Sequence, residues 1–288
     1  MFIDFHAHFD SADREQVRAF VRAAEKNDCL TVFSGGDMGD DHYAPPETVL
    51  KFCREFRERL IPAIKLDLAD REFNLSQLRK RRDQGFKAVK FIYPYYEYDH
   101  DLYMPVYEEL QKLELPALFH TGIYRPQALD ETIRRPMLLN QAPYRLDRIA
   151  RSFPRLPVVE AHLGTAAFRL QGAQMVKIHA NVYADLGGCG NWMAVTPRML
   201  AELLCDDLYV RDASARHFGK LIFGSDCYVT IPEVQTRAVQ YYRHIMEMND
   251  LPPEMRDAIM GGTVARWLKF RRSSAETQTP DILSAAGS

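Results

Sequence analysis

Residues 1–8 read MFIDFHAH, a short apolar run that ends in two histidines separated by one residue. Seven further runs of this kind follow, and the segments between them carry apolar residues at spacings of three and four, which is typical of helices. They are CLTVFSGG (29–36), LIPAIKLD (60–67), GFKAVKFIYP (85–94), LPALFHTG (115–122), LPVVEAHLG (156–164), KIHANVYADLGG (177–188) and KLIFGSD (220–226). Such alternation indicates a parallel sheet of βαβ units. Eight units predict an α/β fold with a single (β/α)8 TIM barrel.

The alternative fold for this pattern is a doubly wound open sheet. That fold usually carries a G-x-G-x-x-G turn after its first strand, and the sequence has neither this turn nor a Walker-type glycine loop. We therefore prefer the barrel and expect it to span residues 1–271. Residues 272–288, rich in serine, threonine and alanine, are expected to form a flexible C-terminal tail.

Composition narrows the class of function. A chain of 288 residues with 47% hydrophobic content can bury a large core, and its 37 basic and 39 acidic residues leave a formal net charge of −2. This balance gives no basic surface for nucleic acid or an anionic membrane. The sequence also shows neither a long apolar segment nor a signal-peptide pattern. We expect a cytoplasmic protein whose partner is a small molecule, or a second copy of the chain in a homodimer.

Polar residues at strand ends provide the strongest functional signal. Side chains alternate along a strand, so His6 and His8 point to the same side, which in a barrel is the lumen. Three other runs end in a polar residue, namely His120, His162 and Asp226. A single strand-end histidine is more often just a hydrogen-bonded residue, but five such groups would converge at the C-terminal mouth of the barrel. Imidazole and carboxylate are ligands for Zn²⁺ or a similar divalent ion.

With these strand-end residues, the sequence resembles the amidohydrolase superfamily. Within that superfamily it is most similar to the amidohydrolase-related group, which includes aminocarboxymuconate-semialdehyde decarboxylase and small metal-dependent hydrolases. The resemblance covers IDFHAH, GFKAVKF, PVYEELQKLELPALFHTG, LDRIARSFPRLPVVEAHLG, NVYADLGG, LIFGSD and the closing GGTVARWL. It implies one divalent metal, most often Zn²⁺ with Mn²⁺ as an alternative, held by a shared set of ligands. These are His6, His8, His120 and Asp226, with His162 acting near the metal or the substrate.

Three functions are compatible with this site. The first hypothesis is hydrolysis of an amide, ester or lactone, with Asp226 as general base and His162 stabilising the developing oxyanion. The second is non-oxidative decarboxylation of an aromatic or unsaturated carboxylic acid. The short loop after His8 favours hydrolysis, because it leaves little material for a lid. A non-catalytic metal-binding protein is the third, and the presence of both Asp226 and His162 argues against it.

Two further groups of residues complete the expected site. The segments after the fourth and fifth strands concentrate tyrosine and arginine, and Tyr93, Tyr124 and Arg125 are candidate contacts for an acidic or aromatic substrate. Strand alternation also predicts that Lys90 and Glu160 face the lumen, where they would form a partly buried ion pair below the metal. A carbamylated Lys90 bridging two metals is the alternative for that lysine.

Overall fold

A computed structural model describes residues 1–36, 43–68, 71–123, 137–188, 195–206 and 217–270, except the side chains of residues 71–74. Residue 271 and the expected tail, 272–288, therefore lie outside the described part of the chain. The eight strands are all parallel and follow the order β7-β6-β5-β4-β3-β2-β1-β8. Their bounds are β1 (Phe2–His8), β2 (Cys29–Gly36), β3 (Leu60–Leu66), β4 (Ala88–Phe91), β5 (Ala117–Phe119), β6 (Val158–Glu160), β7 (Val182–Ala184) and β8 (Cys227–Tyr228).

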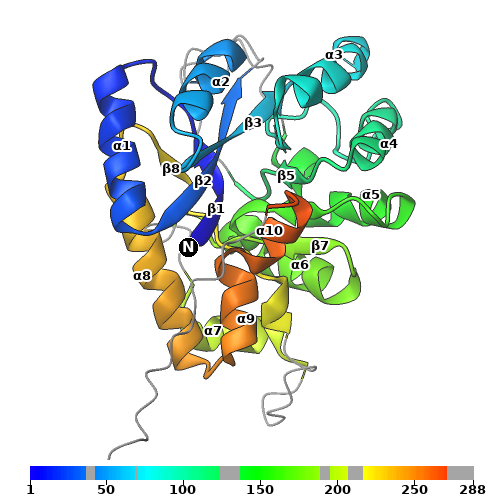
Figure 1. Cartoon of the computed structure of the whole chain (residues 1–288). Helices are drawn as coiled ribbons and strands as arrows, with labels where there is room; N and C mark the ends of the chain where they lie inside the picture. The colour runs from blue at the N-terminus through cyan, green and yellow to red at the C-terminus, as the bar shows by residue number, and fades with distance from the viewer. Residues whose placement is uncertain (37–42, 69–70, 124–136, 189–194, 207–216, 271–288) are drawn as a thin grey trace, which may run out of the picture.

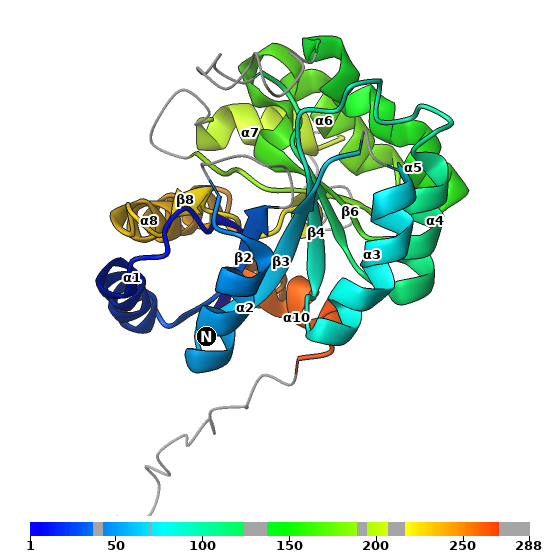
Figure 2. The same cartoon turned by 90° about the horizontal axis from the view of Figure 1, so that it is seen from above.

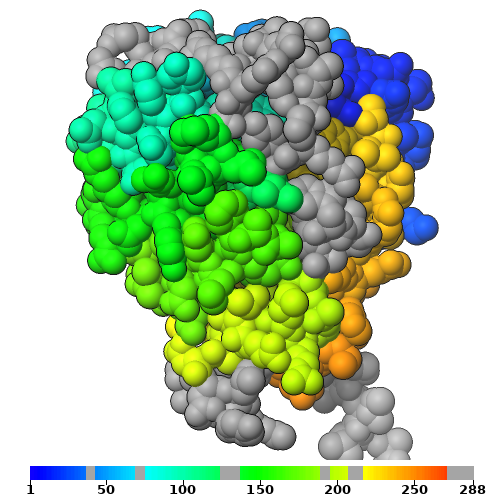
Figure 3. All heavy atoms as spheres, turned by 180° about the vertical axis from the view of Figure 1, so that it is seen from behind, coloured from blue at the N-terminus to red at the C-terminus, as the bar shows by residue number. Residues whose placement is uncertain are grey.

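An α-helix follows each strand, with α9 and α10 coming after α8, and the helices form a ring around the sheet when the molecule is seen from above (Figures 1 and 2). Figure 3 shows the opposite face, whose green to yellow surface includes α5, α6 and α7. The α-helices are α1 (Arg14–Lys26), α2 (Pro46–Glu55), α3 (Arg71–Gln84), α4 (Met104–Leu113), α5 (Asp147–Ser152), α6 (Thr165–Ile178), α7 (Pro197–Leu204), α8 (Glu233–Met248), α9 (Pro253–Asp257) and α10 (Thr263–Trp267). This architecture is the expected (β/α)8 barrel. None of the described helices is long and apolar enough to cross a membrane.

Short irregular helices complete the described elements. They are η2 (Leu138–Gln141), η3 (Pro143–Leu146), η4 (Ala161–Gly164), η6 (His217–Lys220) and the π-helical turn η7 (Ala258–Gly262). η4 carries His162 at the barrel mouth, and η6 comes directly before the segment that closes the barrel.

Two apolar clusters hold the barrel together. The outer cluster lies between the strands and the surrounding helices, and α1 illustrates its origin, because Val17, Phe20, Val21 and Ala24 recur on one helical face and are all buried. The inner cluster fills the barrel with small and branched side chains from β1 to β6, such as Ala63. Residues of α10 belong to the inner cluster too, so this helix closes the N-terminal end of the barrel.

The eighth strand differs from the expectation of residues 220–226. The regular β8 is Cys227–Tyr228, which pairs with β1, whereas the residues before it close the barrel through single hydrogen bonds. Ile222 donates to the Ala184 carbonyl on β7, and the Phe223 carbonyl accepts from Phe5 on β1. Asp226 has a left-handed φ of 59°, which interrupts a regular ladder at this point. Asp226 therefore precedes β8 instead of ending it.

Strands β4 to β7 are also shorter than the apolar runs that predicted them. The run at 177–188 contains the end of α6 at residues 177–178 and a strand of only three residues, 182–184. The run at 156–164 ends in η4, where the backbone leaves the strand conformation. Apolar runs do not distinguish a buried strand from a buried turn at its end, because both are shielded from water.

Candidate metal centre

A bulge in β1 directs both first-strand histidines into the lumen. The pairing of β1 with β2 changes register between Asp4 and Ala7. As a result two consecutive side chains, those of Phe5 and His6, both point into the barrel, and His8 does so two residues later. An extra residue in a bulge resets the alternation of side chains. The expectation that His6 and His8 point to the same side agrees with the structure, although simple alternation from Phe5 would have turned His6 outward.

Asp226 meets both histidines. Its Oδ1 lies 3.1 Å from His6 Nε2 and 2.9 Å from His8 Nε2. The segment that carries Asp226 is fixed to β1 by a buried network, because Asp4 accepts hydrogen bonds from the Ser225 backbone N–H at 2.9 Å and from the Ser225 hydroxyl at 2.6 Å. Gln235 of α8 donates to the same carboxylate at 3.0 Å. These bonds hold Asp226 over the end of β1.

His120 and His162 form a second pair of rings beside this group. His162 Nε2 lies 3.3 Å from His120 Nδ1, and the His162 ring centroid is 5.1 Å from that of His6. His162 reaches the lumen because it adopts a left-handed backbone conformation, with φ 65° and ψ 10°. A non-glycine residue in this conformation is uncommon and is maintained only by its surroundings. The five residues expected at the mouth are therefore neighbours in the structure.

Asp185 is a site residue that the sequence reasoning missed. Its Oδ2 lies 2.8 Å from His6 Nδ1, and its Oδ1 accepts backbone hydrogen bonds from His162 at 2.9 Å and from Gly187 at 2.8 Å. One buried carboxylate thus connects the first strand to the loop after the sixth. The sequence does mark this residue, because in NVYADLGG the polar Asp185 comes shortly before glycine, as His120 does in LFHTG and His162 does in EAHLG.

Close packing around His6 also explains a glycine on the segment before β8. A Cβ atom on Gly224 would lie 2.8 Å from the Asp185 Cβ and 2.9 Å from the His6 Cβ. Real side chains do not approach this closely, so any larger residue at position 224 would push apart β1, which carries His6, and Asp185, which follows β7. Gly224 therefore belongs to the framework of the site.

The predicted ion pair between Lys90 and Glu160 does not form. Lys90 Nζ does face the lumen, but it contacts His6 Nε2. Glu160 points the other way, toward α6, where its Oε1 lies 3.1 Å from the position of a Cβ on Gly172. Neither oxygen of the Glu160 carboxylate has a hydrogen-bond partner among the described residues. The prediction failed because it extended strand alternation through Glu160 to His162, whereas the chain leaves the strand between them.

Aromatic rings form a wall on the His8 side of the site. The Tyr228 ring stacks on His8 with centroids 4.8 Å apart, and the Tyr43 ring lies 5.3 Å from His8. Lys65, which is fully buried, places its ammonium 3.4 Å from the centroid of Tyr43 and 5.6 Å from that of Tyr93. Tyr93 is thus near the expected place, and Tyr43 and Tyr228 were not anticipated. The candidate contacts Tyr124 and Arg125 lie outside the described residues.

The protonation of this site follows from its burial and its charges. Burial lowers the pKa of His8 to about 3 and that of His162 to about 4, which keeps both rings neutral at pH 7. Burial and the Lys90 ammonium act to lower the pKa of His6, but Asp185 and Asp226 outweigh them and raise it. Burial would raise the pKa of Asp226, yet the surrounding histidines hold it well below its usual value.

A family model described as Amidohydrolase matches residues 3–270. The chain belongs to the amidohydrolase family. The expected resemblance to the superfamily is therefore confirmed, and an enzyme is the class of protein that it supports. A search of curated proteins found no match.

Solved structures support the fold of this amidohydrolase at low sequence identity. An uncharacterised TIM-barrel protein from Bordetella bronchiseptica is 16% identical, with a TM-score of 0.66 over 93% of this chain and 98% of the other. A probable 2-pyrone-4,6-dicarboxylic acid hydrolase from Acinetobacter baumannii, crystallised with citric acid, is 13% identical, with a TM-score of 0.60 and coverages of 93% and 99%. A 5-carboxyvanillate decarboxylase from Novosphingobium aromaticivorans, complexed with manganese and a nitrobenzoic acid, is 11% identical, with a TM-score of 0.57 and coverages of 94% and 96%.

The donor atoms of this amidohydrolase fit a divalent metal. His6, His8 and Asp226 offer ligand atoms that all lie within 4.8 Å of one another, and so do His6, His162 and Asp185. The first set is the better match, because both oxygens of Asp185 already accept hydrogen bonds from protein N–H groups. A carboxylate that binds the far nitrogen of a ligating histidine is a common arrangement behind metal centres. The two sets therefore form one centre in which Asp185 supports His6.

Proposed function

We propose that this amidohydrolase is a metal-dependent enzyme for small organic acids, and that it catalyses the non-oxidative decarboxylation of an aromatic or unsaturated carboxylate. The observation that carries the metal-dependent chemistry is the convergence of His6, His8 and Asp226 at 2.9–3.1 Å, next to the buried ammonium of Lys90. The similarity to a 5-carboxyvanillate decarboxylase favours decarboxylation over hydrolysis. Lys65 adds a second buried ammonium beside Tyr43. Positive charge in a buried site favours an anionic substrate over a neutral one.

The proposed metal ligands are His6, His8, His120 and Asp226. Zn²⁺ suits this mixture of imidazole and carboxylate, and Mn²⁺ is the alternative supported by the manganese-containing decarboxylase. A bound divalent cation would supply positive charge that polarises a substrate oxygen and stabilises developing negative charge.

The chain's own residues would handle the proton. Decarboxylation breaks the bond between the carboxylate carbon and the substrate, releases CO2 and leaves an electron pair on the substrate carbon, which must take up a proton. Burial lowers the pKa of Lys90 to about 8, so this ammonium could donate near neutral pH. His162 is a neutral ring, with a pKa lowered by burial to about 4, and its N–H would hold a substrate oxygen. Asp226 and His162 are the proposed catalytic residues, with Lys90 as proton donor.

Hydrolysis of an amide, ester or lactone is the second candidate, and one observation favours it. Asp226 remains ionised, because the nearby histidines keep its pKa well below the usual range although burial acts to raise it. The ionised form is the one that can accept a proton from an attacking water molecule, although the lowered pKa also makes Asp226 a weaker base. The similar hydrolase from Acinetobacter baumannii also acts on an organic acid by its name, so both candidates share an anionic substrate.

The proposal is tested first by metal content. We expect purified protein to hold about one equivalent of a divalent metal. The double variant His6→Ala/His8→Ala should lose this metal, and His244→Ala, an exposed histidine on α8, should retain it. Equal metal content in the wild type and the double variant would contradict the assignment of the ligands.

The reaction is then tested with 5-carboxyvanillate and 2-pyrone-4,6-dicarboxylate as probes. Metal-dependent release of CO2 from the first would support decarboxylation, and ring opening of the second without CO2 would support hydrolysis. Asp226→Asn should lower either rate by about a hundredfold or more, because it removes an acid–base group while preserving the shape of the side chain. A wild-type rate in this variant would exclude Asp226 as a catalytic residue.

A further inference from the structure

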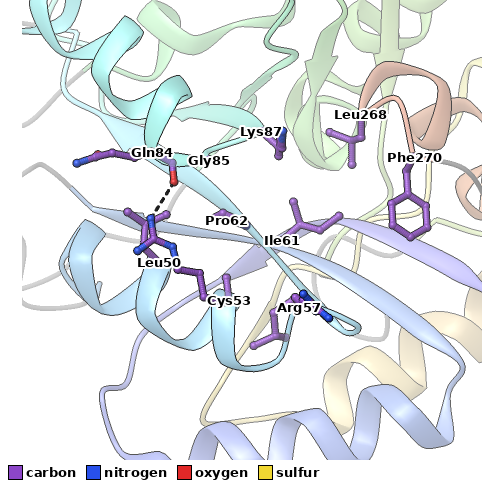
Figure 4. A pocket seen from close by; sticks show the side chains of 12 residues that line it. Leu50, Cys53, Arg57, Ile61, Pro62, Gln84, Gly85, Lys87, Leu268 and Phe270 are labelled. Atoms are coloured by element: carbon purple, nitrogen blue, oxygen red, sulfur yellow. Dashed lines mark hydrogen bonds between the residues drawn. The ribbon is translucent and has the colours of Figure 1, made fainter.

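A cavity of about 430 Å³ lies at the end of the barrel opposite the candidate metal centre (Figure 4). It is bounded by α2, the start of β3, the turn after α3 and the chain that follows α10. Its apolar walls are Leu50, Leu60, Ile61, Pro62, Leu268 and Phe270. This volume falls within the range of about 300–1,000 Å³ that is typical of small-molecule sites.

The cavity is separate from the site described above. Ile61 lines it at the beginning of β3, and Lys65, which stands beside Tyr43 and Tyr93 near the metal centre, lies four residues further along the same strand. Four residues of strand span about 13 Å. Ile61 also belongs to the inner apolar cluster, which fills the barrel between the two ends. A molecule in the cavity would therefore not touch His6, His8 or Asp226.

Three cationic side chains surround the apolar floor of the cavity. Arg54 donates one hydrogen bond to the Gln84 carbonyl at 3.2 Å, and Lys87 has no partner for its ammonium among the residues that the structure describes. Arg57 lies 3.3 Å from Glu58, but both side chains are more than 80% exposed, so this pair is weak. In Figure 4, Arg57 and Lys87 lie on opposite sides of Ile61 and Pro62.

The signs of these charges are all the same. The described residues that line the cavity include two arginines and a lysine but no acidic side chain. An apolar floor edged by cations, of which, among the described residues, only Arg57 has a carboxylate nearby, in the weak exposed pair with Glu58, matches a molecule that has an apolar body and an anionic head. Arginine offers a planar fork of donors that fits a carboxylate, and lysine adds a point charge.

We propose that this cavity is a second binding site, for a medium-chain organic carboxylate. The alkyl chain lies on Ile61 and Pro62, with Leu268 and Phe270 at its side. The carboxylate pairs with Lys87 at one edge of this floor, and Arg57 adds positive charge at the opposite edge. The proposal does not depend on the function assigned to the metal centre, because no residue is shared between the two sites. It would give the protein a binding activity besides its reaction.

Calorimetric titration of the full chain with decanoate tests this site. We expect one molecule to bind, whereas acetate, which has the head alone, and decyltrimethylammonium, which has the opposite charge, should not. Arg57→Ala/Lys87→Ala should weaken decanoate binding by about tenfold, since the charge pair with Lys87 and the added positive charge of Arg57 are both lost. Lys26→Ala, an exposed lysine on α1, is the matched control and should bind as the wild type does.

Two further variants separate this site from other places where decanoate could bind. His6→Ala/His8→Ala should leave its affinity unchanged, and a loss of binding there would place decanoate at the metal centre and overturn the proposal. Deletion of residues 271–288 should also leave it unchanged, and binding that appears only after the deletion would show that the chain's own end fills the cavity. The proposal is equally overturned if decanoate fails to bind, or if Arg57→Ala/Lys87→Ala binds it as tightly as the wild type.

Discussion

Asp185→Asn is the substitution that most directly tests how the metal centre is held. Asp185 Oδ1 accepts two backbone hydrogen bonds, from His162 and Gly187, and Oδ2 lies 2.8 Å from His6 Nδ1. An asparagine would keep its oxygen where the two backbone N–H groups point and would place its NH2 group against His6 Nδ1. That nitrogen would then have to accept a hydrogen bond, and the proton of a neutral His6 ring would move to Nε2.

The size of the effect follows from this change of tautomer. His6 Nε2 faces Asp226, contacts the Lys90 ammonium and is the atom that a metal would take, so the metal must displace Lys90 from this atom and a proton on Nε2 must be removed before it binds. Loss of a carboxylate behind a ligating histidine commonly weakens metal affinity by about 10- to 100-fold. This range corresponds to about 1.4–2.7 kcal/mol of binding free energy. The carboxylate also stabilises folding, so the two effects must be measured separately.

Metal affinity is measured by competition with a chromophoric chelator, and the stability of the metal-free protein by calorimetry. Asp147→Asn is a matched control, because Asp147 lies 2.9 Å from His179 in another Asp–His pair that is remote from the lumen. We expect Asp185→Asn to bind Zn²⁺ at least tenfold more weakly than the wild type and Asp147→Asn to bind it equally well. An affinity for Asp185→Asn within twofold of the wild type would refute the role of Asp185 in orienting His6.

Two other predictions concern the face behind the site. Burial, and to a smaller extent the charge of Asp185, raises the pKa of Glu160 well above its usual value. Above about pH 4.5 the folded state therefore binds more protons than the unfolded state. The free energy of unfolding then falls as the pH rises, by at most about 1.4 kcal/mol per pH unit. Glu160→Gln should therefore gain in urea stability relative to the wild type between pH 5 and pH 7, and parallel pH profiles would contradict this. Gly172→Ala should cost about 1–3 kcal/mol, because its Cβ would lie 3.0 Å from the Leu163 carbonyl carbon. Gly219→Ala, with nothing within 4 Å, should change stability by less than about 0.5 kcal/mol, and an equal loss in both variants would exclude the steric explanation.

Much of the fold could be read from short-range pattern. Runs of β-rich residues alternate with amphipathic segments such as α1, and this order, together with the absence of a glycine-rich phosphate loop, was enough to predict an eight-unit barrel. The polar ends of these runs then pointed to His6, His8, His120, His162 and Asp226. This reasoning works because the parallel strands of a barrel all have their C-terminal ends at the same mouth, and this holds for any packing of the side chains.

The same logic should have included Asp185, which ends the seventh run in the same manner. It was missed because its run looked long, 177–188, and the strand occupies only residues 182–184. The length of an apolar run reports burial, and α6 and β7 are both buried. Aromatic residues such as Tyr43 were missed for a different reason, since nothing local marks a loop side chain that will pack on His8.

Sequence pattern was sufficient for the order of elements and for the types of residue at the barrel mouth, because both depend on local periodicity. The directions of the side chains depended on contacts between distant segments. A bulge turns His6 into the lumen. The left-handed conformation of His162 turns its own ring into the lumen, while Glu160, two positions earlier, faces α6. Conformations of this kind are unfavourable in an isolated chain and persist only where neighbours such as Asp185 hold them, so strand alternation alone could not predict them.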